Sequence, residues 1–175
     1  MPDPYLSDAL KEAYASAPSD EVIYHTLEFR HAAFSQPIRV VRDNADLTAR
    51  LEATAPVDAG AEVTFVGFAF DLVRPEMSAA GVPQCTIEID NVSREILANV
   101  ELAMTSIDPI EVTYREYLAS DLLGPQNDPP MTLEIVSITA DVFRVRATAS
   151  FTNIGNTRFP GEDYTTDRFP GLVAQ

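Results

Sequence analysis

The sequence is poor in the residues that most often build reactive or metal-binding sites. Cys85 is the single cysteine, so no disulfide can form within the chain. The two histidines, His25 and His31, fall on one predicted strand about 20 Å apart, too far to share an ion. We therefore expect a buried, unreactive thiol at Cys85, and two partly buried histidines that each have a hydrogen-bond partner. We expect no bound metal and no cofactor.

Long apolar runs and clustered positive charges are also missing. The longest apolar runs, such as Phe65 to Phe70, are far shorter than the ~20 residues that span a bilayer. The N-terminus lacks the basic and apolar regions of a signal peptide, so we expect residence in the cytoplasm. The net charge is −15 and Lys11 is the only lysine, which argues against specific binding to nucleic acid. An acidic surface could still border a nucleic-acid path by repelling it.

No catalytic motif stands out. The chain has no G-x-S-x-G elbow, and its seven glycines form no phosphate-binding loop. Glu88 and Asp90 share one face of a predicted strand and are candidates for a general acid and base. Because 27 of the 175 residues are acidic, such pairs also arise by chance. We expect a protein that is not an enzyme, and an acid-dependent hydrolase using Glu88 and Asp90 is an alternative.

Hydrophobic periodicity predicts one helix followed by many strands. Leu6, Leu10 and Tyr14 recur at helical spacing, which predicts an amphipathic helix over about 4–17, with Asp3 as its N-cap. A second, inserted helix is predicted over about 92–104. Strands of period two are predicted over 21–30, 38–42, 48–54, 62–73, 84–90, 111–118, 131–140 and 142–152.

This pattern indicates a mainly β, β-rich α+β fold: an antiparallel β-sandwich or barrel with an N-terminal helix and one inserted helix. We predict a single domain over residues 1–155. On its last strand Val145 faces the core, whereas Arg144 and Arg146 face solvent. Both arginines are candidates for ion pairs with a neighbouring subunit, because a guanidinium binds a carboxylate with two hydrogen bonds. The alternative is a cross-strand pair within one subunit.

Residues 156–175, here called the C-terminal arm, repeat one motif. Arg-Phe-Pro-Gly begins at Arg158 and again at Arg168. Each proline fixes its own φ and favours an extended residue before it, so helix is excluded there. The aromatic rings can dock either on their own subunit or on a neighbouring copy. The candidate interface residues of the arm are Phe159, Pro160, Tyr164, Phe169, Pro170 and Leu172.

Several segments carry a resemblance to a known family. Residues 86–96 run from a strand into a helix through Asp90 and Asn91. Further matching features are the N-terminal helix, the strand over 27–31, the strand that begins at Glu62, and the ending from Phe159 to Leu172. Together they resemble an uncharacterised family of tail-associated (tail-tip or baseplate) proteins of long-tailed bacteriophages and prophages.

The resemblance implies a structural virion protein of the siphophage tail tip. Such a protein would assemble in the host cytoplasm into a homo-oligomeric ring around the DNA channel, near the distal end of the tail tube. Its partners would be further copies of itself and adjacent tail proteins: tube, tape-measure end and hub. No catalytic residues come with the family. DNA would pass through an acidic lumen without specific binding, and no membrane partner is implied.

A second function from another class is a soluble β-sandwich module that recognises a carbohydrate or a protein. Tyr114, Tyr117 and the polar loop from Leu118 to Pro130 would supply its binding surface. Exposed aromatic side chains on a strand, beside a polar loop, would favour this function, and the alternative is that Tyr114 packs in the core.

Overall fold

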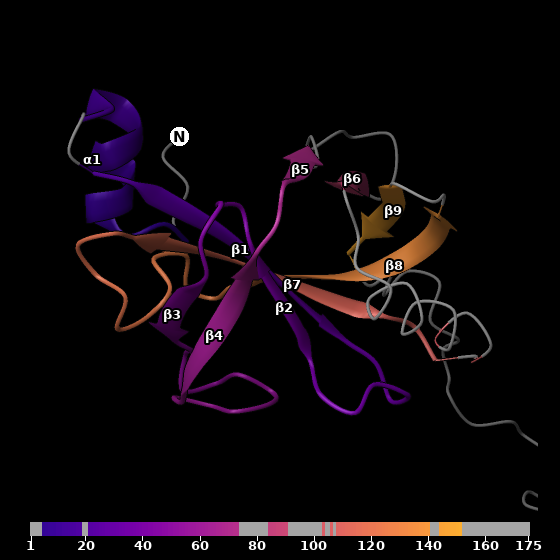
Figure 1. The fold of residues 1–175 in the computed structure, drawn as a ribbon. Helices are drawn as coiled ribbons and strands as arrows, with labels where there is room; N and C mark the ends of the chain where they lie inside the picture. The colour runs from indigo at the N-terminus through magenta and orange to yellow at the C-terminus, as the bar shows by residue number, and fades with distance from the viewer. Residues whose placement is uncertain are drawn as a thin grey trace, which may run out of the picture.

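The computed structural model describes residues 5–18, 21–73, 84–90, 103, 106, 108–140 and 144–151, with the backbone alone at Asp90 and Ala140. One helix and nine strands lie in these parts, and all strands belong to one sheet (Figure 1). The mainly β class and the N-terminal helix are thus confirmed. The predicted inserted helix near 92–104 and the C-terminal arm lie outside the described residues, apart from Ala103.

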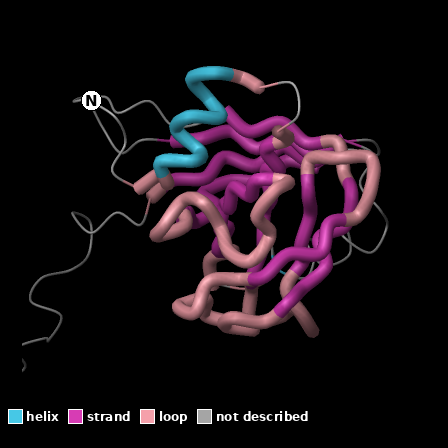
Figure 2. The backbone as a smooth tube through the Cα atoms, turned by 90° about the vertical axis from the view of Figure 1, so that its left-hand side faces the viewer, coloured by secondary structure: helices cyan, strands magenta, loops and turns pink. Residues whose placement is uncertain are grey.

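The helix α1 (Asp8–Ser16) begins later than predicted. Ser7, and not Asp3, caps it, because the Ser7 hydroxyl accepts a hydrogen bond from the Leu10 amide at 3.1 Å. Leu10 is fully buried in a small cluster with Ala13 and Leu118. The helix therefore packs its apolar stripe on one end of the sheet, as Figure 2 shows.

The strand order is β3-β4-β2-β1-β7-β8-β9-β6-β5. The bounds are β1 (Ile23–Arg30), β2 (Ile38–Val41), β3 (Leu47–Arg50), β4 (Glu62–Gly67), β5 (Phe70–Val73), β6 (Gln84–Asp90), β7 (Glu111–Leu118), β8 (Met131–Ala140) and β9 (Arg144–Ser150). Every pair is antiparallel except β2 with β4, which is parallel.

The predicted strand over 62–73 is wrong in one respect, because it is two strands. Gly67 ends β4, and only Phe68 and Ala69 separate it from β5, which lies at the opposite edge of the sheet. The Phe68 amide donates to the Val41 carbonyl at 2.9 Å, and Arg42 pairs with Asp71 at 3.0 Å. The sheet therefore curls until β5 returns to the end of β2, which makes it a partly open barrel (Figure 1).

Both faces of the central strands β1 and β7 are buried. One face carries Leu27, Val112 and Tyr114 into the core inside the curl, together with Ile87 and Leu133. The other face is covered by the β3–β4 hairpin and the loop that follows β3, with a second apolar cluster around Phe65 and Tyr117. The polar residues on this second face are consequently removed from water as well.

Candidate functional site

A groove lies at the seam where the curled sheet meets itself, and it is the candidate functional site. Residues 42–44, residues 68–71, Glu88 and Arg144 line this seam groove, whose volume is about 460 Å³. Such a volume falls within the ~300–1,000 Å³ of typical ligand sites. The groove lies beside β5, the last strand of the sheet.

Ion pairs cross the strands that form the groove. Arg146 contacts Glu88 at 2.6 Å and Arg144 contacts the same carboxylate at 3.4 Å. The pair of Glu88 with Arg146 follows directly from the register of β6 and β9, which sets these residues opposite each other. Within the described chain, Arg144 and Arg146 therefore both contact a carboxylate of their own subunit. Both side chains remain about half exposed.

The turn that forms one wall of the groove is tightly fitted. The Gly67 amide donates to the Asp46 carboxylate at 2.9 Å, and the Asp43 carboxylate accepts from the Asn44 amide at 2.6 Å. A Cβ at position 67 would lie 2.9 Å from the Asp43 carbonyl oxygen. Glycine is therefore required where the chain leaves β4 and passes along the turn.

A second cluster of charged groups lies on the buried face of β1 and β7. Glu28 and Arg115 are both fully buried, and Glu28 accepts from Arg39 at 2.7 Å and from Arg30 at 3.3 Å. Arg115 donates to both carboxylate oxygens of Glu52 at 2.7 and 2.8 Å. This buried ion network ties the loop after β3 to the centre of the sheet.

Burial and charge act in opposite directions on Glu52. Burial alone would raise the pKa of the Glu52 carboxyl, but hydrogen bonds from Arg115 and its own backbone, with the attraction of Arg115 and Arg30, lower it. Burial by itself disfavours the charged form of Arg115, yet the hydrogen bonds to Glu52 and the charge of Glu28 raise its pKa. Both groups are consequently ionised in the folded protein.

A third polar cluster anchors the helix. Tyr14 of α1 and Tyr114 of β7 each donate a hydroxyl proton to the buried carboxylate of Glu116 at 2.6 Å. The His25 Nδ1 atom lies 2.7 Å from the Tyr114 hydroxyl. That hydroxyl has one proton and gives it to Glu116, so His25 donates from Nδ1. The cluster fixes α1 on the sheet.

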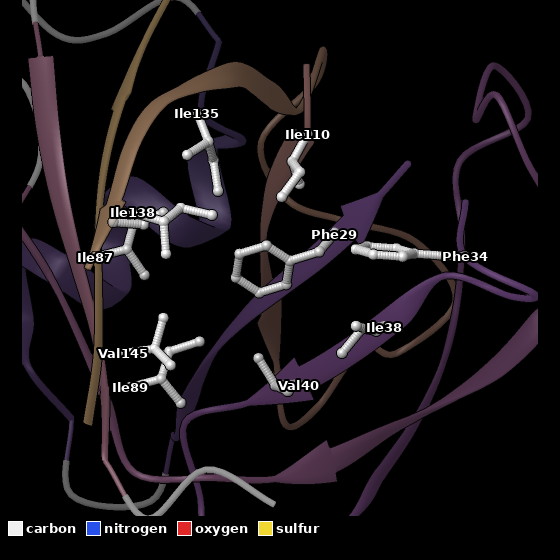
Figure 3. A pocket seen from close by; sticks show the side chains of 11 residues that line it. Phe29, Phe34, Ile38, Val40, Ile87, Ile89, Ile110, Ile135, Ile138 and Val145 are labelled. Atoms are coloured by element: carbon white, nitrogen blue, oxygen red, sulfur yellow. The ribbon is translucent and has the colours of Figure 1, made fainter. Parts of the chain in front are cut away.

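An apolar cavity lies inside the curl of the sheet (Figure 3). Phe29 and Val40 point from one side toward Ile87 and Val145 on the other, and Phe34 lies at its edge. The cavity holds about 30 Å³ and all of its lining side chains are apolar, so it is close to the volume of one water molecule and offers water no partner. It is a packing space of the core.

The other residues singled out by sequence have the following places. His25 and His31 are both partly buried, and the His31 ring contacts the Asp108 carbonyl at 3.1 Å. Cys85 is buried and unpaired, and burial raises the pKa of its thiol. Tyr114 and Tyr117 are buried, so neither offers the exposed aromatic surface that favoured the binding-module hypothesis. The six candidate interface residues of the C-terminal arm lie outside the described residues.

Two further structural findings concern metal binding and membrane crossing by the described residues. Within them, no group of three or more histidine, cysteine, aspartate or glutamate side chains converges to hold a metal ion. No helix in the same parts of the chain has the length and apolarity that a membrane crossing requires.

The described residues form a mainly β protein with a helix packed on the end of its sheet. Comparison with known proteins then assigns the chain to a family. Residues 9–164 match a family described as a domain of unknown function, DUF1833, and the chain belongs to this family. The match covers all nine described strands. No curated protein matches the chain.

Proposed function

We propose that this protein is a structural component of the tail tip or baseplate of a long-tailed bacteriophage. It acts without catalysis, as a subunit of a homo-oligomeric ring around the DNA channel. The proposal extends the resemblance carried by residues 86–96 and the ending from Phe159 to Leu172. The first part of that motif, Thr86 to Asp90, lies in strand β6, and Glu88 of this strand lines the seam groove.

The observation that carries an assembly function is the end of the sheet. No described strand pairs with the outer edge of β5, and the charged seam groove runs beside this edge. An unpaired edge presents backbone donors and acceptors that a further chain can bind. A ring needs such a heterologous contact, in which one surface of a subunit meets a different surface of the next.

Rigidity and charge support the same function. The central strands are buried on both faces, and the ion network around Glu28 and Arg115 holds the covering loop on the sheet. A subunit of this kind keeps its shape within an assembly. The net charge of −15 suits a ring through which DNA slides, because like charges oppose adhesion.

Disruption of the gene in a phage that encodes this chain tests the proposal. Electron microscopy of the lysate should show tails that are absent or truncated at the distal end, and infectivity should return when the chain is supplied in trans. Normal, infectious particles that lack the chain would refute the proposal.

The seam groove favours a second candidate function, a soluble binding module for a carbohydrate or a protein. Its polar lining and volume of about 460 Å³ suit a polar ligand. A glycan array probed with the purified chain should then show binding that is lost in Asp71→Ala. If no glycan on the array binds, and gene disruption gives the expected tail defect, the binding-module function is refuted and only the tail function remains.

A further inference from the structure

The hydrogen-bond partners of His31 fix which of its ring nitrogens carries the proton. The Ala33 amide donates to Nδ1 at 3.0 Å, so this nitrogen accepts and has no hydrogen. The Nε2 atom lies 3.1 Å from the Asp108 carbonyl oxygen, which can only accept, so Nε2 donates. Both contacts therefore require the neutral ring with its proton on Nε2. His25 has the opposite tautomer, because it donates from Nδ1.

The two contacts join two segments that border the apolar cavity of the core. The turn after β1 carries Phe34, whose amide donates to the His31 carbonyl at 3.0 Å. The Phe34 ring lies 5.4 Å from the imidazole ring, centroid to centroid. Asp108 precedes Ile110, and both Phe34 and Ile110 line the cavity (Figure 3). The His31 ring therefore holds the turn that carries Phe34 to the segment that leads into β7.

A second proton on His31 is incompatible with one of these contacts. The imidazolium carries a hydrogen on Nδ1, which would face the hydrogen of the Ala33 amide, and two donors cannot form a hydrogen bond. The contact with the Asp108 carbonyl remains, because a charged donor forms a stronger hydrogen bond than a neutral one. Protonation therefore separates the Ala33 amide from the ring while the ring stays bound to Asp108.

The charged groups of the neighbouring segments do not replace the lost contact. Residues 32–37 have no ionisable side chain. The Asp108 carboxylate accepts from a serine hydroxyl at 3.4 Å, Glu111 of β7 pairs with Arg30 of β1 at 2.9 Å, and Glu134 lies opposite Glu111 on β8. None of these carboxylates forms an ion pair with His31 in the described parts of the chain. A positive charge on His31 therefore gains no described ion pair that would keep the turn closed.

We propose that His31 is a pH-sensitive switch that controls access to the apolar cavity. The neutral ring keeps the turn closed, with Phe34 against the cavity. Histidine takes up a proton between about pH 8 and pH 5, and His31 is partly exposed, so solvent protons reach it. A proton binds the released turn better than the closed one, so acid shifts the population towards release. Phe34 then leaves the cavity, whose apolar lining becomes a contact surface. This switch does not depend on the proposed ring.

Nitrogen NMR of the two imidazole rings in the full chain tests the assigned tautomers. At neutral pH we expect the proton on Nε2 of His31 and on Nδ1 of His25, so each histidine is the control for the other. A proton on Nδ1 of the neutral His31 ring would overturn the proposal, because the Ala33 amide would then have no acceptor there.

Hydrogen exchange of the Ala33 amide follows the switch. Its protection, corrected for the intrinsic effect of pH, should fall by about tenfold from neutral to acidic pH as the turn opens locally. His31→Asn places an acceptor oxygen close to the position of Nδ1 and takes up no proton in this range, so its protection should stay constant. His25→Asn is the matched control and should respond like the wild type. Constant protection in the wild type, or an equal fall in His31→Asn, would contradict the switch.

The methyl signals of Ile38 and Ile110, which both line the cavity, report whether Phe34 moves. In the wild type they should shift with the same midpoint as the Ala33 amide, and in His31→Asn they should not. Phe34→Ala should bind an apolar dye at neutral pH, whereas the wild type should bind it only in acid. If the Ala33 contact breaks but the methyl signals do not follow, the turn does not control the cavity and the proposal is wrong.

Discussion

The buried ion network makes a quantitative prediction for Glu52→Ala. In the folded protein the Glu52 carboxylate accepts two hydrogen bonds, at 2.7 and 2.8 Å, from the fully buried guanidinium of Arg115. Its removal leaves Arg115 with Glu28 at 3.7 Å as the nearest described carboxylate. The Arg115 Nη1 atom is already buried without a hydrogen-bond partner. No other described acceptor near the guanidinium can therefore replace the Glu52 carboxylate.

The expected loss in the free energy of unfolding is that of leaving a buried charge without its partner. Breaking a buried ion pair by removing one partner costs about 3–5 kcal/mol. The Glu52 side chain is 12% exposed, so water can partly replace it and the lower end, about 3 kcal/mol, is expected. For a chain of this size each kcal/mol lowers Tm by about 2–4 °C, so Tm should fall by roughly 6–12 °C.

Chemical and thermal unfolding, followed by circular dichroism, measure this change. Glu12→Ala, which removes an exposed carboxylate from α1, is the matched control and should stay within about 0.5 kcal/mol of the wild type. A Glu52→Ala variant that also loses less than about 1 kcal/mol would refute the reasoning, because the network would then contribute no more than a surface pair.

The pH dependence of the same pair provides an independent test. The pKa of Glu52 is lowered in the folded protein from its ordinary value of 4.5. A lowered folded pKa contributes stability above the unfolded pKa and loses it as pH falls through the folded one. The stability difference between wild type and Glu52→Gln should therefore shrink as pH falls below about 4.5. A difference that stays constant through this range would contradict the assigned ion pair.

Three further predictions concern the core and the seam. Burial raises the pKa of Tyr117, so wild-type stability should fall as pH rises above 10. In unfolding curves, Tyr117→Phe should show a smaller loss of stability at alkaline pH. The same variant should lose about 1 kcal/mol of stability because its hydrogen bond is removed. Gly67→Ala should destabilise by about 1–3 kcal/mol in urea unfolding, because its Cβ meets backbone at 2.9 Å; Gly124→Ala, with open space around it, should not. Leu27→Ala should cost about 2–5 kcal/mol at a fully buried site, against little for Val136→Ala, which is 61% exposed.

Local periodicity was sufficient for the class of the fold and for most strand bounds. The alternation on β9 correctly predicts Val145, Ala147 and Ala149 as buried, with Arg144 exposed. β7 has the predicted bounds, Glu111 to Leu118. These features depend only on side chains of one strand, so the sequence contains them.

Features that depend on distant partners were not predictable. Thr26, Glu28 and Arg30 alternate with apolar residues, which is typical of the solvent-exposed face of a strand, yet all three are buried. Their burial results from the covering hairpin and from the arginines that neutralise Glu28. The break between β4 and β5 was missed for the same reason, since Gly67 and the turn at Asp43 meet only in three dimensions.

The candidate site was predicted in part. Arg144 and Arg146 were singled out, and the structure brings them to the seam groove with Glu88. Arg42 and Asp71 were not assigned to it, because the groove exists only where the curled sheet returns to its own beginning. Two local signals pointed to this region: the charge alternation on the last strand, and the carboxylates Glu88 and Asp90 on one face of the strand over 84–90.

The copy number of the chain in purified phage tails tests the central claim most directly. Quantitative mass spectrometry against a tail-tube protein of known copy number gives this value. We predict several copies per tail, equal to the order of a closed ring. A chain that is absent from purified tails, although abundant in the infected cell, would contradict the account.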